Sequence, residues 1–322
     1  MESNFVTINK VPTKVITLGS KIEENPPKLI IVIPGKCYNF HKRKDIVFCS
    51  SFSLLGNPGS TGFYIDFMHY LKNEKPSYSI WTIAHAGHEN PKGSSLPDLN
   101  ENPDLFSLQA NIQHKVDFIK TYIDPKKTEV ILVGHSIGCK MVIEIMKSEV
   151  VDFKMGCLLF PMIERMKFTP AGKRTWKLVY YIPKLVIGLA WILSLIPQSI
   201  LTTFIRFWME LTKTSSLSDS NLNAVLKLID PEVIKHSFYL ADTEFQTVLD
   251  PDYESIAKLQ DKLKFYYGTI DAWVPTEYYE ELVQNVPNVH AELCTSKHPH
   301  AFVLSASEPM AEIVAGWINS LE

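Results

Sequence analysis

A serine between two glycines is the first residue of this chain whose type and spacing suggest chemistry. The run from Val130 to Met141 reads VILVGHSIGCKM, an apolar stretch, then Gly-His-Ser-Ile-Gly, then a stretch with helical spacing. Gly-x-Ser-x-Gly between a strand and a helix is typical of a nucleophile elbow, whose sharp turn exposes the serine hydroxyl. Backbone N–H groups at the start of the following helix would stabilise developing negative charge. The pattern therefore predicts that Ser136 is a nucleophile rather than part of an ordinary turn.

A serine nucleophile needs a general base and an orienting acid, and the chain offers both downstream. In this arrangement the order along the chain is Ser, acid, His. The run LKFYYGTIDAWVP predicts a strand, a turn and then Asp271, and VHAELCTSKHPHAFVL predicts a strand over Val289–Cys294, a loop and His300. Asp271 would hold the imidazole in one tautomer, and His300 would take the Ser136 proton and pass it to the leaving group.

Other residues compete for these roles. Glu164 follows an expected strand and could be the acid, although a solvated surface charge is the plainer interpretation. His298 is the closest rival as base. His135, inside the elbow, is expected to pack against the sheet. His85 and His88 follow another expected strand, where they would either line the pocket or close a turn.

The composition narrows the class of protein. The 322 residues are 46% apolar and 21% charged, which indicates a globular chain with a substantial core. A net charge of −3 argues against a nucleic-acid partner. The short histidine pairs have no zinc spacing and the five cysteines form no CxxC pair, so we expect no metal, no cofactor and reduced thiols. The N-terminus lacks the pattern of a secretory signal, so the protein is expected to start in the cytosol.

Apolar runs of strand length alternate with helical patterns along most of the chain. Strands are expected at Leu29–Ile33, Tyr78–Ala84, Val130–Val133, Met155–Leu159 and Leu263–Tyr267, and an opening hairpin at Phe5–Ile8 and Lys14–Leu18. Helices are expected at Phe63–Leu71, Leu105–Ile123, Gly138–Met146 and Ser307–Leu321. The alternation predicts an α/β fold, with a mainly parallel sheet and helices on both faces.

Residues 161–256 break this alternation. They lie between two expected strands, so we interpret them as a helical lid or membrane-contact insertion within a single domain that spans residues 1–322. Residues 185–205 of this insertion, LVIGLAWILSLIPQSILTTFI, carry no charge and are long enough to span a bilayer.

A single membrane crossing would place Ser136 on one side of the bilayer and Asp271 and His300 on the other. A helical hairpin or an in-plane helix is therefore expected, which would contact one lipid leaflet through roughly residues 177–209. A buried lid helix without membrane contact is the alternative.

Five motifs occur in a characteristic order: NPGSTGFY, HAGHE, GHSIG, FYYGTIDAWVP and HAFV. Together they resemble the lipid droplet-associated hydrolases, which are serine hydrolases of the α/β-hydrolase fold, and the resemblance covers nearly the whole chain. It implies that Ser136, Asp271 and His300 form a catalytic triad. It also implies a lipid ester as substrate, with sterol esters proposed, and a location on lipid droplets and the endoplasmic reticulum, on the cytosolic face.

One segment departs from the family pattern, which continues after the early strand as Ile-Pro-Gly-Asn-Pro-Gly. Here Gly35 is separated from Asn57 by residues 36–56. The loop after this strand normally donates one oxyanion N–H, so Ile137, Gly35 and Asn57 are the expected backbone donors and an insertion would disturb them.

The inserted segment has ends that resemble splice sites. Gly35-Lys36-Cys37 can be encoded with a splice donor, CSSFSLLG can be encoded with an acceptor, and excision would keep the reading frame and restore the family motif. Our hypothesis is a translated intron; a disordered surface loop is the alternative, since long loops are tolerated energetically.

The motifs thus predict a serine hydrolase, and the resemblance implies that it acts on a lipid ester, with a role in neutral lipid or cholesterol homeostasis. Two other functions remain open. A non-catalytic droplet-coat or tethering protein would still act after Ser136→Ala, and an acyltransferase with the same triad would need an acceptor other than water.

Overall fold

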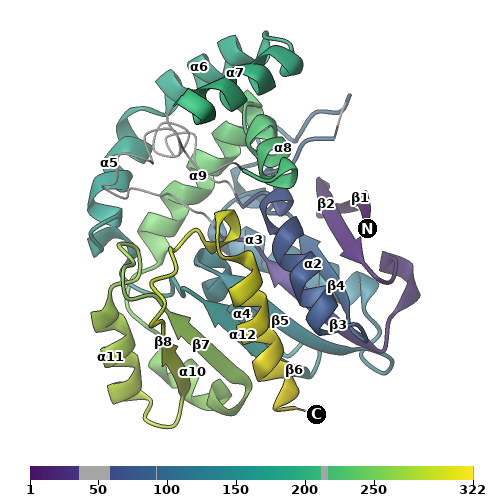
Figure 1. Ribbon diagram of the computed structural model, residues 1–322, viewed down its shortest axis with the longest axis vertical. Helices are drawn as coiled ribbons and strands as arrows, with labels where there is room; N and C mark the ends of the chain where they lie inside the picture. Colours follow the sequence, from purple (N-terminus) through teal and green to yellow (C-terminus); the bar gives the residue numbers. More distant parts are fainter. Residues whose placement is uncertain (36–58, 92, 212–216, 322) are drawn as a thin grey trace.

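An eight-stranded sheet forms the centre of the protein. The computed structural model describes residues 1–35, 59–91, 93–211 and 217–321 (Figure 1). The strand order is β1-β2-β4-β3-β5-β6-β7-β8, in which β1–β2 and β2–β4 are antiparallel and the other neighbours are parallel. The strands are β1 Glu2–Ile8, β2 Val11–Leu18, β3 Lys28–Ile33, β4 Ser79–Ile83, β5 Glu129–His135, β6 Phe153–Leu159, β7 Leu263–Tyr267 and β8 His290–Leu293. The mainly parallel sheet and the opening hairpin are confirmed.

Strand β3 shows why the parallel strands read as continuous apolar runs. Leu29, Ile31 and Ile33 belong to one hydrophobic core. Ile30 and Val32 belong to a second core on the opposite face. All five are 1% exposed or less, because a parallel sheet with helices on both faces has no solvent-facing side.

Four helices make up most of the two covering layers. On one face α2, Ile65–Glu74, packs beside α12, Ser307–Asn319. On the other face α3, Leu108–Tyr122, lies beside α4, Ile137–Lys147 (Figure 1). The helix expected from Phe63 begins instead as a 3-10 turn, and the helix expected from Leu105 begins at Leu108. The second difference follows from Ser107, whose side chain accepts the N–H of Ala110 and caps the helix.

Helices α5 to α9, which follow β6, gather beyond one end of the sheet (Figure 1). They are α5 Gly172–Tyr181, α6 Pro183–Ser194, α7 Gln198–Leu211, α8 Asp219–Lys227 and α9 Pro231–Thr247. Helix α10, Tyr253–Leu259, returns the chain to the opposite end of the sheet, where β7 starts (Figure 1). Helix α11, Thr276–Asn285, follows β7 in the chain. The short 3-10 helices are η1 Ile22–Glu24, η3 Thr61–Tyr64, η4 Pro103–Leu105, η5 Met166–Phe168, η6 Gln260–Lys262 and η7 Phe302–Leu304. Helix α9 anchors the group, since Ile234 packs with Val186 and Ala190 of α6.

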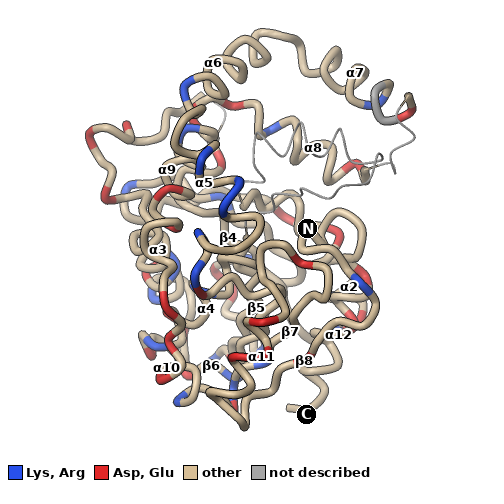
Figure 2. Tube along the Cα trace, turned by 90° about the vertical axis from the view of Figure 1, so that its left-hand side faces the viewer, with Lys and Arg blue, Asp and Glu red and all other residues tan. Residues whose placement is uncertain are grey.

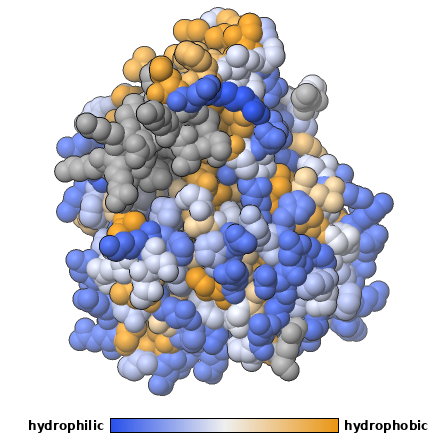
Figure 3. Space-filling view, in the orientation of Figure 1, coloured by the Kyte–Doolittle hydropathy of each residue, from blue (hydrophilic) through white to orange (hydrophobic). Residues whose placement is uncertain are grey.

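Helices α6 and α7 bury Val186, Ala190 and Ile205 but expose many of their other apolar side chains. Figure 3 shows hydrophobic residues over these helices, and Figure 2 shows few charges along them. The exposed residues of α5–α7 include Tyr180, Tyr181, Leu185, Leu189, Trp191, Ile192, Leu195, Ile200, Phe204, Phe207 and Leu211. In the described part of the chain, no individual helix has the length and apolarity needed to cross a membrane; α5 and α6 meet these criteria only as a pair, bent by 72°.

Some predictions fall on residues that the structure does not describe. The proposed inserted segment, residues 36–56, and Asn57 lie outside the described residues, as do Cys37 and Cys49. The three described cysteines, Cys139, Cys157 and Cys294, are buried free thiols.

Candidate active site

Ser136 occupies the turn between β5 and α4. Its backbone has φ 53° and ψ −122°, a combination that a residue with a Cβ rarely adopts. Backbone hydrogen bonds hold this conformation: the Ser136 N–H donates to the carbonyl of Leu159 at 3.0 Å, and the Ser136 carbonyl accepts the N–H groups of Cys139 at 3.0 Å and Met162 at 3.1 Å. Strain that the surroundings hold in place is common at catalytic turns, and the geometry matches the predicted elbow.

The two glycines of the elbow leave room for main chain. A Cβ on Gly134 would lie 2.8 Å from the Cα of Cys139. A Cβ on Gly138 would lie 2.4 Å from the carbonyl oxygen of Ile33 and 2.6 Å from that of Pro34. The Gly-x-Ser-x-Gly spacing is therefore a packing requirement, because the start of α4 lies against the end of β5 and against the end of β3.

The fold brings Asp271 and His300 to Ser136. His300 Nε2 lies 2.8 Å from Ser136 Oγ, and His300 Nδ1 lies 2.6 Å from Asp271 Oδ2. The other carboxylate oxygen accepts the N–H groups of Trp273 at 2.7 Å and Val274 at 3.1 Å. The Asp271 side chain is fully buried and that of His300 is 7% exposed.

These contacts determine where the protons lie. An ionised carboxylate only accepts hydrogen bonds, so His300 carries its proton on Nδ1 and donates it to Asp271. In the neutral imidazole Nε2 then has a free lone pair, which accepts the hydroxyl proton of Ser136. The arrangement is ready to remove that proton as the hydroxyl attacks an electrophile.

The three predicted oxyanion donors have different outcomes. Ile137 is the first residue of α4, so its N–H has no acceptor within the helix and lies beside the nucleophile. The prediction for Gly35 needs correction, because its N–H donates to the Tyr64 hydroxyl at 2.7 Å and is committed there. Asn57 lies outside the described residues.

His135 contacts more than the sheet. Its Nδ1 lies 2.6 Å from the Tyr64 hydroxyl and its Nε2 lies 2.8 Å from the backbone carbonyl oxygen of His300. The ring also packs edge-on against Phe302, with centroids 4.7 Å apart. Burial strongly lowers the pKa of His135, and the neighbouring His300 lowers it further, so the ring is neutral.

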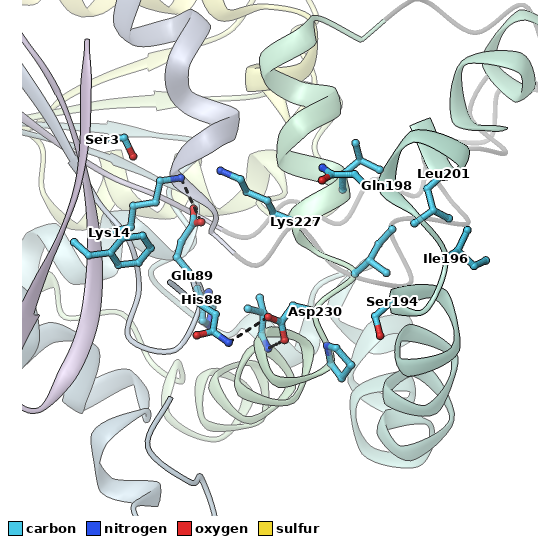
Figure 4. Close-up of a pocket in the computed structure, with 16 residues that line it drawn as sticks. Ser3, Lys14, His88, Glu89, Ser194, Ile196, Gln198, Leu201, Lys227 and Asp230 are labelled. Atoms are coloured by element: carbon cyan, nitrogen blue, oxygen red, sulfur yellow. Dashed lines mark hydrogen bonds and ion pairs between the residues drawn. The ribbon is translucent and has the colours of Figure 1, made fainter. Parts of the chain in front are cut away.

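A buried ion pair organises the chain that leads into α2 (Figure 4). Lys14 Nζ lies 3.3 Å from Glu89 Oε2, and both side chains are 6% exposed. Glu89 Oε1 accepts the hydroxyls of Ser60 at 2.8 Å and Thr61 at 2.9 Å. Burial lowers the pKa of Lys14, although the Glu89 carboxylate opposes this shift. Glu89 thus ties the segment before Tyr64 to β2.

The other residues considered as acid, base or pocket residues make contacts elsewhere. Glu164 is buried, not solvated as expected, and its carboxylate accepts from the Arg165 guanidinium. The His298 N–H donates to the Cys294 sulfur at 3.4 Å. His85 packs where a Cβ on Gly59 would come within 2.4 Å of its ring.

His88 lines a cavity of about 720 Å³ between the opening hairpin, the loop after β4 and the turns joining α6–α7 and α8–α9 (Figure 4). None of Ser136, Asp271 and His300 lines this cavity. It is therefore separate from these three residues.

Sequence reasoning assigned no role to Tyr64 and Glu89. Both stand in motifs that carried the family resemblance, NPGSTGFY and HAGHE. A buried polar residue inside a motif is a usable signal, but its partners are far away in the chain. Tyr64 meets a residue 71 positions later, and Glu89 meets one 75 positions earlier.

Known proteins resemble this chain along most of its length. The family model described as lipid-droplet associated hydrolase matches residues 49–303. The chain is similar to a lipid droplet-associated hydrolase of Drosophila melanogaster, with 35% identity over 330 aligned positions that cover 99% of this chain and 98% of the relative. It is also similar to one of Mus musculus, with 33% identity over 99% of this chain and 95% of the relative.

Solved structures with the same architecture are more distant in sequence. MGS-M2, an α/β hydrolase from a deep-sea metagenome library, superposes with a TM-score of 0.64 at 12% identity, over 98% of this chain and 97% of that one. A serine hydrolase involved in carbazole degradation superposes with a TM-score of 0.59 at 16% identity, over 100% and 99% of the two chains. At such identities the likeness concerns the fold alone, and it confirms the predicted α/β-hydrolase fold.

Proposed function

Because this chain belongs to the lipid droplet-associated hydrolase family, we propose that it is a serine hydrolase that cleaves a lipid ester at the surface of lipid droplets. Sterol esters are the substrate class we propose, and neutral lipid and cholesterol homeostasis the process. The endoplasmic reticulum membrane, on its cytosolic face, would be the second location. The observation that carries the proposal is the hydrogen-bonded series Ser136–His300–Asp271, with contacts of 2.8 and 2.6 Å.

The first half of the reaction forms an acyl-enzyme. Ser136 Oγ attacks the ester carbonyl carbon while His300 Nε2 takes its proton. The tetrahedral oxyanion receives the Ile137 N–H and the positive end of the α4 dipole. When the intermediate collapses, His300 returns the proton to the departing alcohol oxygen, and Asp271 stabilises the imidazolium in between.

The second half releases the acid. A water molecule gives a proton to His300 and attacks the acyl carbonyl, and collapse of this second intermediate returns the proton to Ser136 Oγ. The carboxylic acid then leaves. This route requires no metal or cofactor.

Contact with a lipid surface is supported by the exposed face of α6 and α7. Leu185, Trp191 and Leu195 of this face are 72%, 58% and 65% exposed. An apolar surface of this extent is unusual for a protein surrounded by water and is typical of an interaction site. We propose that roughly residues 177–209 dock onto one phospholipid leaflet, and that residues 161–256 form a lid that shapes the acyl pocket.

Labelling by a fluorophosphonate probe tests the catalytic part. The full chain, a chain lacking residues 36–56, and Ser136→Ala versions of both would be compared. We expect labelling that disappears with Ser136→Ala, and release of a fatty acid from a sterol ester emulsion by each form that labels. No labelling of either form would overturn the proposal and favour a non-catalytic droplet protein.

Comparing the two chain lengths also tests the intron hypothesis. Labelling of the shortened chain alone would mean that residues 36–56 are incompatible with an active site. Equal labelling of both would mean that they are a tolerated loop. Product analysis with an added alcohol separates hydrolysis from acyl transfer, because only an acyltransferase would form the new ester in preference to the free acid.

A further inference from the structure

One series of hydrogen bonds joins segments that are distant in the sequence. The Gly35 N–H donates to the Tyr64 hydroxyl at 2.7 Å, that hydroxyl lies 2.6 Å from His135 Nδ1, and His135 Nε2 lies 2.8 Å from the carbonyl oxygen of His300. Gly35 follows β3, Tyr64 ends η3, and His135 ends β5 directly before the nucleophile. The series therefore connects the end of β3 and the elbow to the residue that carries the base.

The direction of every proton in this series follows from chemistry. A carbonyl oxygen only accepts, so His135 Nε2 must carry the proton that faces His300. The buried ring is neutral, so Nδ1 has no proton and accepts the Tyr64 O–H. The Tyr64 oxygen in turn accepts the Gly35 N–H. Only one tautomer of His135 satisfies all three contacts.

The surroundings strengthen these bonds. Tyr64 is fully buried and His135 is 1% exposed. Phe302 packs edge-on against both rings, and Phe160 packs edge-on against the His135 ring. Hydrogen bonds in such an apolar environment are stronger than in water, and breaking one leaves a buried polar group without a partner.

We propose that Tyr64 and His135 are positioning residues that hold the main chain of His300 against the elbow, so that its imidazole meets Ser136 and Asp271 at once. His300 is then held at three points: Asp271 at Nδ1, Ser136 at Nε2, and His135 at the backbone carbonyl. Ser136 and His135 are adjacent, so nucleophile and base share one rigid support. This inference rests on the proposed function, and it explains why NPGSTGFY and GHSIG occur together.

The hydrogen-bonded series Gly35–Tyr64–His135–His300 is called the relay below. Tyr64→Phe tests it by deleting one oxygen atom. We expect kcat on a soluble short-chain ester to fall about 10-fold with KM almost unchanged, because small displacements of catalytic groups are costly. Active sites would be titrated with a fluorophosphonate, so that a loss of folded protein does not count as a loss of kcat. An unchanged kcat per titrated site would overturn the proposal.

The matched control is Tyr267→Phe. Tyr267 is also fully buried, and its hydroxyl has no hydrogen-bond partner among the described residues. Removing it should leave kcat unchanged. An equal loss of kcat in both variants would mean that any buried hydroxyl matters, which contradicts a specific relay.

Two substitutions of His135 separate hydrogen bonding from packing. Gln can still donate to the His300 carbonyl from its side-chain amide, whereas Leu cannot, so His135→Gln should retain several-fold more kcat than His135→Leu. The double variant Tyr64→Phe/His135→Leu should lose little more than His135→Leu alone, because both act in one series. Equal losses for Gln and Leu, or additive losses in the double variant, would overturn the proposal.

The tautomer of His135 can be measured independently of catalytic activity. Nitrogen NMR of the full chain with labelled histidine should show His135 neutral, with its proton on Nε2, and Tyr64→Phe should shift the Nδ1 signal. A proton on Nδ1 would overturn the relay even in an active enzyme. The expected tautomer in a protein that no probe labels would retain the relay geometry while the proposed function fails.

Discussion

The carboxylate of Asp271 approaches His300 Nδ1 to 2.6 Å while its other oxygen accepts two backbone N–H groups. The loop that carries Asp271 therefore orients its carboxylate independently of the contact with His300. A carboxylate that is oriented in this way selects the tautomer of the imidazole and stabilises its charged form.

Replacing Asp271 with Asn should abolish most of the activity. The Asn amide can donate to Nδ1 and so favour the wrong tautomer of His300, in which Nε2 no longer accepts the Ser136 proton. We expect kcat to fall roughly 10³–10⁴-fold with little change in KM. The measurement is steady-state hydrolysis of a soluble ester, with Glu164→Gln as control. If Glu164→Gln lost as much kcat, Glu164 would be the acid.

A methyl group on Gly138 should destroy the elbow. Its Cβ would overlap the carbonyl oxygens of Ile33 and Pro34, which are main-chain atoms that cannot move aside cheaply. We expect Gly138→Ala to lose at least about 2 kcal/mol of unfolding free energy, together with fluorophosphonate labelling.

Gly316→Ala serves as its control, because a Cβ there meets nothing within 4 Å and the residue lies in the interior of α12. This variant should gain roughly 0.5–1 kcal/mol, since Ala favours the helix more than Gly does. Urea unfolding measures both changes. Wild-type stability and labelling in Gly138→Ala would contradict the close approach of α4 to β3.

If the exposed apolar surface of α6 and α7 contacts lipid droplets, as proposed above, one charge introduced there should weaken binding to droplets. Leu195, between α6 and α7, is 65% exposed. Leu195→Asp should reduce partition onto triglyceride droplets coated with phospholipid at least about 10-fold, because it loses a buried leucine and adds a charge. Leu321→Asp, close to the C-terminus at the far end of the molecule (Figure 1), is the matched control and should bind normally. Equal effects of the two substitutions would exclude this surface.

A buried lysine predicts a pH-dependent stability. Lys115 on α3 is fully buried and donates to the Ala84 carbonyl at 2.8 Å. Burial lowers its pKa from 10.5 to about 7. Between these two values the unfolded chain binds a proton that the folded chain does not, so the stability contributed by this group rises with pH.

Lys115→Met removes this titration. The difference in unfolding free energy between wild type and variant should move in favour of wild type by roughly 2 kcal/mol from pH 7 to pH 9. Lys120→Met, an exposed position of the same helix, controls for the loss of a surface lysine. Urea unfolding at each pH provides the measurement, and parallel curves for wild type and Lys115→Met would show that the lysine does not titrate in this range.

Much of the fold could be predicted from the sequence because the patterns that indicate it are local. A strand buried on both faces is a short apolar run, as in β3, and Gly-x-Ser-x-Gly describes one turn whose glycines are required by contacts close to it. The sequence could predict that Ser136, Asp271 and His300 lie close together, because each follows a strand and parallel strands end at the same edge of the sheet. Helix starts were less predictable, since capping by Ser107 competes with hydrophobic spacing.

The sequence alone therefore determined the alternation of strands and helices, the elbow that carries Ser136, and the prediction that Asp271 and His300 lie beside it. Neighbouring residues carry that information. Only the tertiary structure decided that the Gly35 N–H belongs to Tyr64, that His135 holds the carbonyl of His300, and that α6 and α7 turn their apolar side chains outward. Each of these depends on which distant segments meet. Spacing along the chain contains no measure of that, because long-range contacts are chosen by the packing of the whole core.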